Sequence, residues 1–250
     1  MLKTVICDWN RTLFEDEFET EFFRGLASYV TENSLKNFKL GKLFRLWNAK
    51  KRCESLHRQI LKSKRIAPEQ TIEEILDILN RTIIRGLSVV ALDKYLIIYA
   101  EEARKRLAQE LLRPLRNIRE QYQVLLGILS SGCDVAIAQT LAAGGYQFDF
   151  VKANRFQQIG GQLESFQFEI CANKVGVLKN IFAERKIDPD STMYIGNDWP
   201  DKECLKLVRY PVVSFLACPE TRISLKREVN AYVPNSERDF VQHLQEALSQ

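Results

Sequence analysis

Histidine is scarce in this chain, and its cysteines are never clustered. Among the 250 residues there are 2 histidines and 6 cysteines. The cysteines stand singly, without a CxxC pair or a nearby histidine cluster, so we predict neither a zinc site nor a disulfide framework but reduced, mostly buried thiols. His57 and His243 each lie in a Leu-rich, helix-like stretch without a suitably spaced serine, cysteine or acid. A histidine-based catalytic dyad is therefore not expected.

Long apolar runs are also missing. No stretch of about 18 or more apolar residues occurs, and Met1 leads directly into a strand-like segment instead of a basic leader. We therefore expect a cytoplasmic protein that is neither exported nor inserted into a membrane. With 46% apolar and 27% charged residues, the composition is that of an ordinary globular protein of one large or two smaller domains.

The net charge of +4 is unevenly distributed. Between Lys36 and Arg65 there are eleven Lys or Arg residues and one acid, Glu54. Such a stretch could favour an anionic partner, but a solvated helix face is the more ordinary explanation. The same stretch carries apolar residues at helical spacing, Leu43, Phe44, Leu46 and Trp47. Nucleic-acid binding is not expected on this feature alone.

A long helical region separates the first two strand-like segments. Residues 3–8 (KTVICD) read as a short buried strand that ends in a carboxylate, and 134–138 (DVAIA) read as the next strand. The region between them, from about 15 to 113, shows apolar residues at helical spacing. Three such sets are Phe18, Phe22, Leu26 and Tyr29; Ile72, Ile75, Leu76 and Leu79; and Leu92, Leu96, Tyr99 and Ala103. We predict an inserted all-helical segment.

From Pro114 onward, helices and strands alternate. The pattern predicts helices at 116–130, 173–185 and 202–208, strands at 134–138, 148–152, 192–195 and 211–215, and a hairpin at 156–168. Such alternation is typical of an α/β fold with a mainly parallel, doubly wound sheet, in which ligands bind at the carboxyl ends of the strands.

Three polar clusters follow predicted strands. The first is residues 8–13 (DWNRTL), the second is Gln139-Thr140, and the third is residues 196–201 (GNDWPD), while Lys174 opens the helix before the last of these strands. This order resembles the four motifs of the haloacid dehalogenase superfamily, the Mg²⁺-dependent aspartate phosphohydrolases. The run 148–168 is similar to the segment before the lysine in phosphoserine phosphatase-like members.

The resemblance covers the core segments and not the sequence of the helical insertion. It implies a three-layer α/β/α, Rossmann-like core formed by residues 1–14 and 114–250, with residues 15–113 as a helical C1-type cap. Cap closure would shield the site and supply specificity. The implied substrate is a small phosphorylated metabolite.

The resemblance also implies roles for the strand-end residues. Asp8 is the nucleophile that forms an aspartyl-phosphate. Lys174 steadies it as a point charge. Mg²⁺ neutralises the charge of the phosphoryl oxygens. The ligands of Mg²⁺ that the resemblance implies come from both ends of the chain. They are Asp8, the carbonyl of Asn10, Asn197, Asp198 and Asp201.

The substrate-binding residues implied are four. Thr12 fixes the loop after the nucleophile, and Arg11 meets the substrate anion or closes the entrance. Gln139 aligns with the hydroxyl residue of the second motif, so that Thr140 would have to supply the hydroxyl from the next position.

Departures from the family pattern leave several functions open. Asn10 stands where the family carries its general acid, and an amide neither protonates a leaving group nor activates water. Asn197 stands where the first metal-binding aspartate is expected. A slow phosphatase, an acceptor with a long-lived aspartyl-phosphate, and a noncatalytic binding protein all fit. A metal-independent dehalogenase also tolerates Asn10, but it leaves Asp198 and Asp201 without a purpose.

Overall fold

The computed structural model describes residues 1–15, 18–36, 48, 51–52, 69–170 and 173–250. Most of the basic stretch between Lys36 and Arg65 lies outside the described residues, together with His57, Cys53 and Cys171. The expectations for these residues remain predictions.

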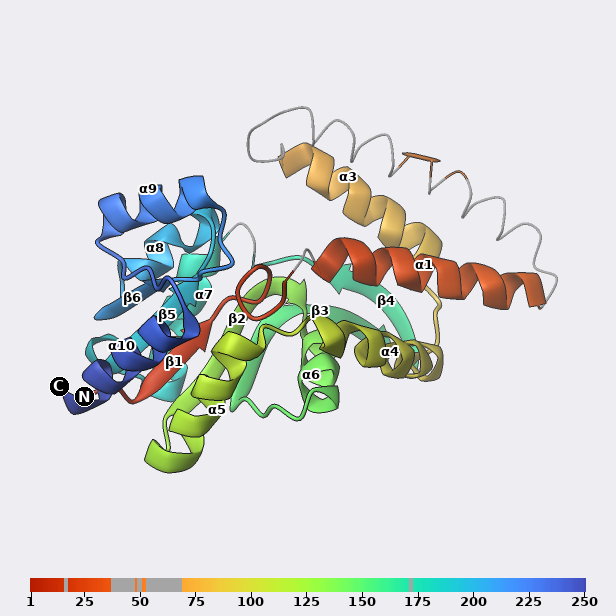
Figure 1. The fold of residues 1–250 in the computed structure, drawn as a ribbon. Coiled ribbons are helices and arrows are strands. Elements are labelled where there is room, and N and C mark those ends of the chain that lie inside the picture. Colours follow the sequence, from red (N-terminus) through yellow and green to blue (C-terminus); the bar gives the residue numbers. More distant parts are fainter. Residues whose placement is uncertain (16–17, 37–47, 49–50, 53–68, 171–172) are drawn as a thin grey trace. The chain divides into compact units, whose positions relative to one another are not determined.

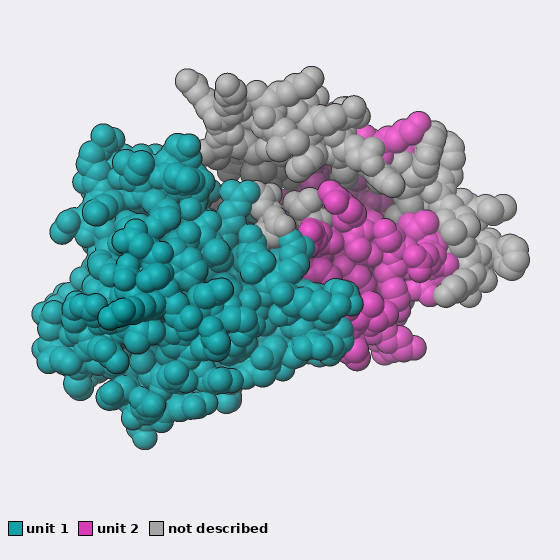
Figure 2. Space-filling model, viewed as in Figure 1, with its two compact units in different colours: residues 1–19, 100–154, 168–250 teal, residues 20–99, 155–167 magenta. Residues whose placement is uncertain are grey.

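The chain divides into two compact units (Figure 2). Unit 1 consists of residues 1–19, 100–154 and 168–250, and unit 2 consists of residues 20–99 and 155–167. These limits differ at three places from the predicted cap, residues 15–113, and the first is that residues 15–19 fall in unit 1. Residues 100–113 join unit 1, where Leu107 bridges to Phe14 and the amide of Ala108 donates to the carbonyl of Leu13 (3.0 Å). The hairpin at 155–167 joins unit 2.

The sheet has six strands in the order β4-β3-β2-β1-β5-β6. All neighbouring strands are parallel except for β3 and β4, which form an antiparallel hairpin (Figure 1). The fold is therefore α/β with a mainly parallel sheet, as predicted. The strands are β1 (Thr4–Cys7), β2 (Leu125–Cys133), β3 (Phe150–Ile159), β4 (Gln162–Gln167), β5 (Thr192–Gly196) and β6 (Tyr210–Val213).

Helices cover both faces of the sheet in unit 1. Alternate residues of a strand point to opposite faces, so Ile6 of β1 packs on the side of α7, α8 and α9. Helix α5 packs against β2 and α10, and the amide of Leu2 donates to the carbonyl of Ala247 (2.9 Å), so the two termini lie side by side (Figure 1). These helices are α5 (Gln109–Tyr122), α6 (Asp134–Ala143), α7 (Lys174–Arg185), α8 (Lys202–Leu205), α9 (Pro219–Val229) and α10 (Glu237–Ser249).

Unit 2 contains α3 (Glu69–Leu79) and all but the terminal residues of α1 (Phe18–Lys36) and α4 (Val89–Ala103). The β3–β4 hairpin packs against α1 through aromatic rings. The ring centroids of Phe156 and Phe22 are 6.4 Å apart, and those of Phe166 and Phe23 are 5.0 Å apart. The side chain of Asn80 also accepts the amide hydrogen of Phe166 (2.7 Å). The hairpin therefore belongs to the helical unit. Within the described residues, no helix has both the length and the hydropathy to cross a membrane.

The predicted helix 116–130 and strand 134–138 are wrong in position. Helix α5 ends at Tyr122 because Gln123 adopts a left-handed conformation (φ 55°). The next segment is β2, a buried parallel strand, and such strands lack the alternation that marks half-buried ones. Residues 134–138 open helix α6, in which Ala136, Ile137, Thr140 and Leu141 are buried at helical spacing.

Gly127, in the middle of β2, has no room for a side chain. A Cβ atom there would lie 2.0 Å from the ring of Phe150 on β3. We predict that Gly127→Ala lowers the free energy of unfolding by about 1–3 kcal/mol through overpacking, as measured by urea denaturation. In a Phe150→Leu background, Gly127→Ala should lower the free energy of unfolding by less. An equal loss in both backgrounds would contradict the steric explanation.

Candidate active site

Strand order brings polar and charged residues of three distant segments together at one edge of the sheet in unit 1. Asp8 directly follows β1, the turn 197–201 directly follows β5, and these strands are parallel neighbours. Because parallel strands end at the same edge, their carboxyl-terminal residues lie together. Lys174, the first residue of α7, reaches the same place.

Lys174 lies between two carboxylates. Its Nζ is 2.6 Å from Asp8 Oδ1 and 2.6 Å from Asp201 Oδ1. The three side chains are 7%, 8% and 1% exposed, respectively. Water therefore screens these charges little, and each depends on the others for compensation.

Asp201 is held by four donors. Besides Lys174, the Tyr194 hydroxyl donates to Oδ1 (2.8 Å), while the amides of Asn197 and Asp198 donate to Oδ2 (3.0 and 3.4 Å). Gly196 permits this arrangement, because a Cβ atom there would lie 2.6 Å from Asp201 Cβ. Asp201 is thus an internal anchor of the turn.

Asn197 faces the other oxygen of Asp8. One terminal atom of its side-chain amide lies 2.9 Å from Asp8 Oδ2 and 3.1 Å from the carbonyl oxygen of Asn10. If that atom is nitrogen, it donates a hydrogen bond to each oxygen. Hydrogen bonding favours nitrogen, because an oxygen there would face only acceptors; a bound divalent cation would instead favour the oxygen, since it attracts carbonyl and carboxylate oxygens.

The electrostatics follow from burial. Removal from water raises the pKa of Asp8 to about 7; the charge of Lys174 opposes this rise, and that of Asp201 adds to it. The Lys174 ammonium loses hydration as well, but its two carboxylate partners raise its pKa and keep it charged. Burial and then the charge of Asp201 raise the pKa of Tyr194, so its hydroxyl stays protonated and acts as a donor.

The loop after Asp8 turns sharply. The carbonyl of Trp9 accepts hydrogen bonds from the amides of Thr12, Leu13 and Phe14 (3.2, 2.9 and 3.0 Å). Arg11 occupies the left-handed region (φ 48°) and is exposed at the tip. Thr12 is fully buried, and its hydroxyl makes no hydrogen bond within the part of the chain that is described. That Thr12 fixes the loop stays a prediction.

The two tryptophans beside Asp8 and Asp198 differ in burial. Trp9 is completely buried and stacks on Phe14, with the ring centroids 5.7 Å apart. Trp199 is 43% exposed, and the Lys202 ammonium lies 5.4 Å from its ring centroid. Trp9 therefore belongs to the core.

The placement of Gln139 and Thr140 at a strand end is wrong. Both lie inside α6, where Gln139 is exposed and the hydroxyl of Thr140 donates to the carbonyl of Ala136 (2.8 Å). The hydroxyls at the end of a strand next to β1 are those of Ser130 and Ser131 in β2. In the sequence, the apolar run that ends in Ser130 and Ser131 was the signal that could have located this strand end.

Asn154 joins this strand end to the segment before α7. Its Nδ2 donates to the carbonyl of Ser131 (2.5 Å), and its Oδ1 accepts from the amides of Glu169 and Ile170 (2.9 and 3.0 Å). The side chain is almost completely buried. Asn154 and Tyr194 are two supporting residues that pattern reasoning missed, since neither carries a motif.

The predicted metal ligands differ in their surroundings, and their role stays a prediction. Within the described residues, no group of three or more His, Cys, Asp or Glu side chains could hold a metal. Asp198 is exposed, and its Oδ1 accepts the amide hydrogen of Trp199 (2.7 Å). Asp201 is occupied by its four donors. Asp8 Oδ2 and the carbonyl oxygen of Asn10 instead lie 2.9 and 3.1 Å from one terminal atom of the Asn197 side-chain amide.

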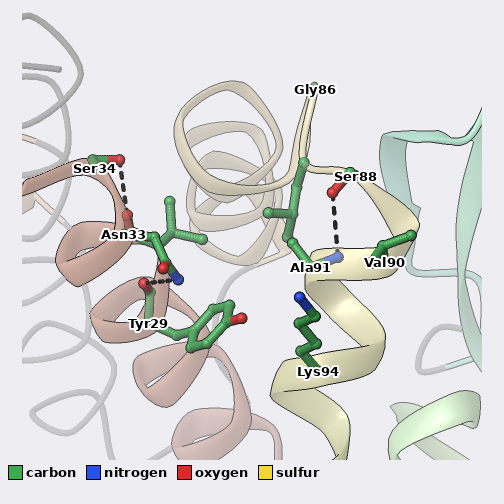
Figure 3. Close-up of a pocket in the computed structure, with 10 residues that line it drawn as sticks. Tyr29, Asn33, Ser34, Gly86, Ser88, Val90, Ala91 and Lys94 are labelled. Carbon is green, nitrogen blue, oxygen red and sulfur yellow. Dashed lines mark hydrogen bonds between the residues drawn. The ribbon is translucent and has the colours of Figure 1, made fainter. Parts of the chain in front are cut away.

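A separate cavity of about 390 Å³ lies within unit 2, between α1 and α4 (Figure 3). The side chains of Asn33 and Ser34 bond back to the carbonyls of Tyr29 and Val30 in their own helix (3.0 and 2.8 Å). Lys94 extends into the space from α4 (Figure 3). These groups form no cluster comparable to that of Asp8 and Lys174, so the strand ends remain the candidate active site.

Comparison with solved structures identifies the fold. No protein-family model matches the sequence, and no curated protein matches it. A substrate-bound phosphoserine phosphatase complex is 17% identical and aligns over 97% of this chain and 98% of its own, with a TM-score of 0.56. A protein of unknown function from Bordetella pertussis Tohama I aligns over 94% and 99% at 15% identity, with a TM-score of 0.68. Cytosolic 5'-nucleotidase IIIB bound to cytidine aligns over 99% and 86% at 12% identity, with a TM-score of 0.62.

The chain is thus structurally similar, over its whole length, to phosphoserine phosphatases and other hydrolases of the haloacid dehalogenase type. The six-stranded sheet with its helical region matches the fold of these proteins with a cap. At such low identities the similarity shows the fold and not the reaction.

The raised pKa of Asp8 has a consequence for stability. Its ordinary value is 3.8, and in the folded protein it is about 7. Between these two values the folded state keeps a proton that the unfolded chain has released, so stability falls as the pH rises from 3.8 to about 7 and changes no further above that range. We predict that Asp8→Asn gains stability relative to the natural chain as the pH rises over this range, in urea unfolding measured at several pH values.

Asp149 is a control whose pKa is shifted in the opposite direction. Although burial pushes the pKa of Asp149 upward, hydrogen bonds from Arg119 and the amide of Leu126 outweigh it and hold the pKa low. Asp149→Asn should therefore lose stability relative to the natural chain as the pH rises. Stability curves for Asp8→Asn and the natural chain that run parallel would refute the assignment for Asp8.

Proposed function

We propose that this protein is a slow phosphohydrolase of the haloacid dehalogenase type, which transfers the phosphoryl group of a small phosphorylated metabolite to Asp8 and then to water. The observation that carries the proposal is the buried contact of 2.6 Å between Lys174 Nζ and Asp8 Oδ1. A strand-end carboxylate with one oxygen against an ammonium group and the other 2.9 Å from the side-chain amide of Asn197 is arranged for attack on phosphorus.

The chemistry would proceed in two steps. One oxygen of Asp8 attacks phosphorus, a P–O bond to Asp8 forms, and the bond to the leaving oxygen breaks. Water then attacks phosphorus, which releases phosphate and restores the carboxylate. Lys174 lies where it would stabilise the negative charge during both steps, and the hydroxyls of Ser130 and Ser131 at the end of β2 are candidates to bind a phosphoryl oxygen.

The residues present fit a bound Mg²⁺. Two neighbouring ligands, each about 2.1 Å from an octahedral Mg²⁺, lie about 3.0 Å apart. The amide atom of Asn197 is 2.9 Å from Asp8 Oδ2 and 3.1 Å from the carbonyl oxygen of Asn10. With oxygen in that position, these three groups would hold the ion. Bound Mg²⁺ would neutralise part of the charge on the phosphoryl oxygens.

Asn10 restricts the substrates that react. An amide does not protonate a departing alkoxide, and loss of a general acid-base costs roughly 10²- to 10⁴-fold in rate. The natural chain would therefore act best on phosphates whose leaving groups depart without a proton. The aspartyl-phosphate would also be long-lived, because no acid-base group at residue 10 activates water.

The other orientation of Asn197 supports a second candidate. With its nitrogen toward Asp8 Oδ2 and the Asn10 carbonyl, the amide satisfies both oxygens without a cation. That arrangement fits a protein that binds a phosphorylated ligand without turnover, or a metal-independent dehalogenase. Metal dependence separates these alternatives from the phosphohydrolase.

We predict that aryl phosphates are hydrolysed only with Mg²⁺ and only while Asp8 is present. Asp8→Asn should abolish phosphate release, since an amide does not attack phosphorus. Asn10→Asp should raise turnover of esters with poor leaving groups by roughly 10²- to 10⁴-fold, and of activated esters by less. Steady-state phosphate release from a series of leaving groups measures both effects.

Asn10→Ala is the matched control, because it removes the amide without supplying an acid. Its rate should stay near that of the natural chain. If every variant remains at background, Asn10→Asp included, the phosphohydrolase proposal fails and a binding role becomes the better explanation.

We also predict that Asn197→Asp tightens Mg²⁺ binding by about tenfold, since it places a second negative charge beside Asp8. Isothermal titration calorimetry with Mg²⁺ measures the affinity. Asn235→Asp adds the same charge at an exposed position and should leave the affinity unchanged. Absence of Mg²⁺ binding in both the natural chain and Asn197→Asp would favour the metal-free alternatives.

A further inference from the structure

Tyr194 contacts the machinery of the site without belonging to any of its motifs. It lies on β5 and is completely buried, and its hydroxyl donates to Asp201 Oδ1 at 2.8 Å. The same oxygen lies 2.6 Å from Lys174 Nζ, which in turn lies 2.6 Å from Asp8 Oδ1. A continuous chain of contacts therefore connects the hydroxyl with the nucleophile.

Asp201 has little freedom to rearrange. Its Oδ2 accepts the amide hydrogens of Asn197 and Asp198, which belong to the backbone of the turn. Its Oδ1 accepts from Tyr194 and Lys174, which together fill the two lone pairs of a carboxylate oxygen. Each oxygen of Asp201 is therefore fully used.

Loss of the tyrosine hydroxyl would change how Lys174 is shared. A buried carboxylate oxygen that loses a donor is left with an unsatisfied lone pair, which is costly. The nearest flexible donor is the Lys174 ammonium, whose three hydrogens rotate freely. Lys174 would shift toward Asp201 and away from Asp8.

We propose that Tyr194 is a positioning residue, which holds Lys174 against Asp8 Oδ1 by satisfying Asp201. The catalytic consequence of this role rests on the proposed function, whereas the placement of Lys174 does not. Tyr194 touches no reacting atom and acts only through Asp201 and Lys174.

Tyr210 supplies a matched control. It lies on β6, the strand paired with β5, where it is opposite Met193 and only 6% exposed. Within the described residues, its hydroxyl makes no hydrogen bond. Tyr210→Phe therefore removes a buried hydroxyl from the same sheet without affecting Asp201.

Crystal structures of Tyr194→Phe and Tyr210→Phe, in the full chain, test the placement directly. In Tyr194→Phe we expect Lys174 Nζ to leave hydrogen-bonding distance of Asp8 Oδ1 while it stays on Asp201. In Tyr210→Phe the contact of 2.6 Å should remain. Should Lys174 keep its contact with Asp8 in Tyr194→Phe, the inference is overturned, whatever the activity.

Kinetics with an aryl phosphate test the consequence. Tyr194→Phe should lower kcat about tenfold, the effect of one hydrogen bond to a charged group, with KM unchanged. Tyr210→Phe should change neither constant, and thermal unfolding of both variants would expose any loss of folded protein. Equal losses of kcat in the two variants would also overturn the inference.

The two measurements separate the two proposals. If the natural chain shows no turnover but Lys174 moves in Tyr194→Phe, the positioning role holds and the phosphohydrolase proposal fails. If turnover is present and Lys174 does not move, the phosphohydrolase proposal stands and the role of Tyr194 is refuted.

Discussion

Lys174 carries its charge where little water reaches it, and two carboxylate oxygens, of Asp8 and Asp201, lie 2.6 Å from its Nζ. Removal of one partner from a buried ion pair typically costs about 3–5 kcal/mol, because the remaining charge is left uncompensated. The three residues come from the position directly after β1, the start of α7 and the turn after β5. Correct assembly of unit 1 is therefore tied to correct assembly of the candidate site.

The order of the strands makes this assembly possible. β1 lies between β2 and β5, so the ends of all three strands lie side by side. Ser130 and Ser131, Asp8, and the turn that begins at Asn197 are then neighbours along one edge. Asn154 supports the β2 side and Tyr194 supports the β5 side, each through hydrogen bonds made in the interior.

Two amides distinguish this site from the pattern that its fold suggests. Asn10 removes an acid-base group, and Asn197 removes a negative charge from the place where a cation would bind. Both changes weaken chemistry that depends on charge, yet Lys174 and its two carboxylates are retained. This balance is the reason for our proposal of a site that would bind a phosphoryl group and form an aspartyl-phosphate but would turn over slowly.

Pattern reasoning located the nucleophile candidate, the lysine and the acidic turn, because each stands directly beside a buried strand or opens a helix. It also predicted the parallel sheet and the inserted helices, since alternation of elements and helical periodicity are local properties. It failed at 116–138, where a buried strand without alternation resembles a helix and where the start of α6 resembles a strand. For the same reason it placed Gln139 and Thr140 at a strand end, whereas both lie inside α6.

The sequence by itself determined which residues could carry chemistry and in what order they follow one another. Only the tertiary structure decided that Asp201 is an internal anchor, that Tyr194 completes its hydrogen bonds, and that the β3–β4 hairpin belongs to the helical unit. These facts depend on contacts between residues far apart in the chain or on opposite sides of a turn. Side-chain direction and burial arise only when the strands pair, and no local pattern encodes them.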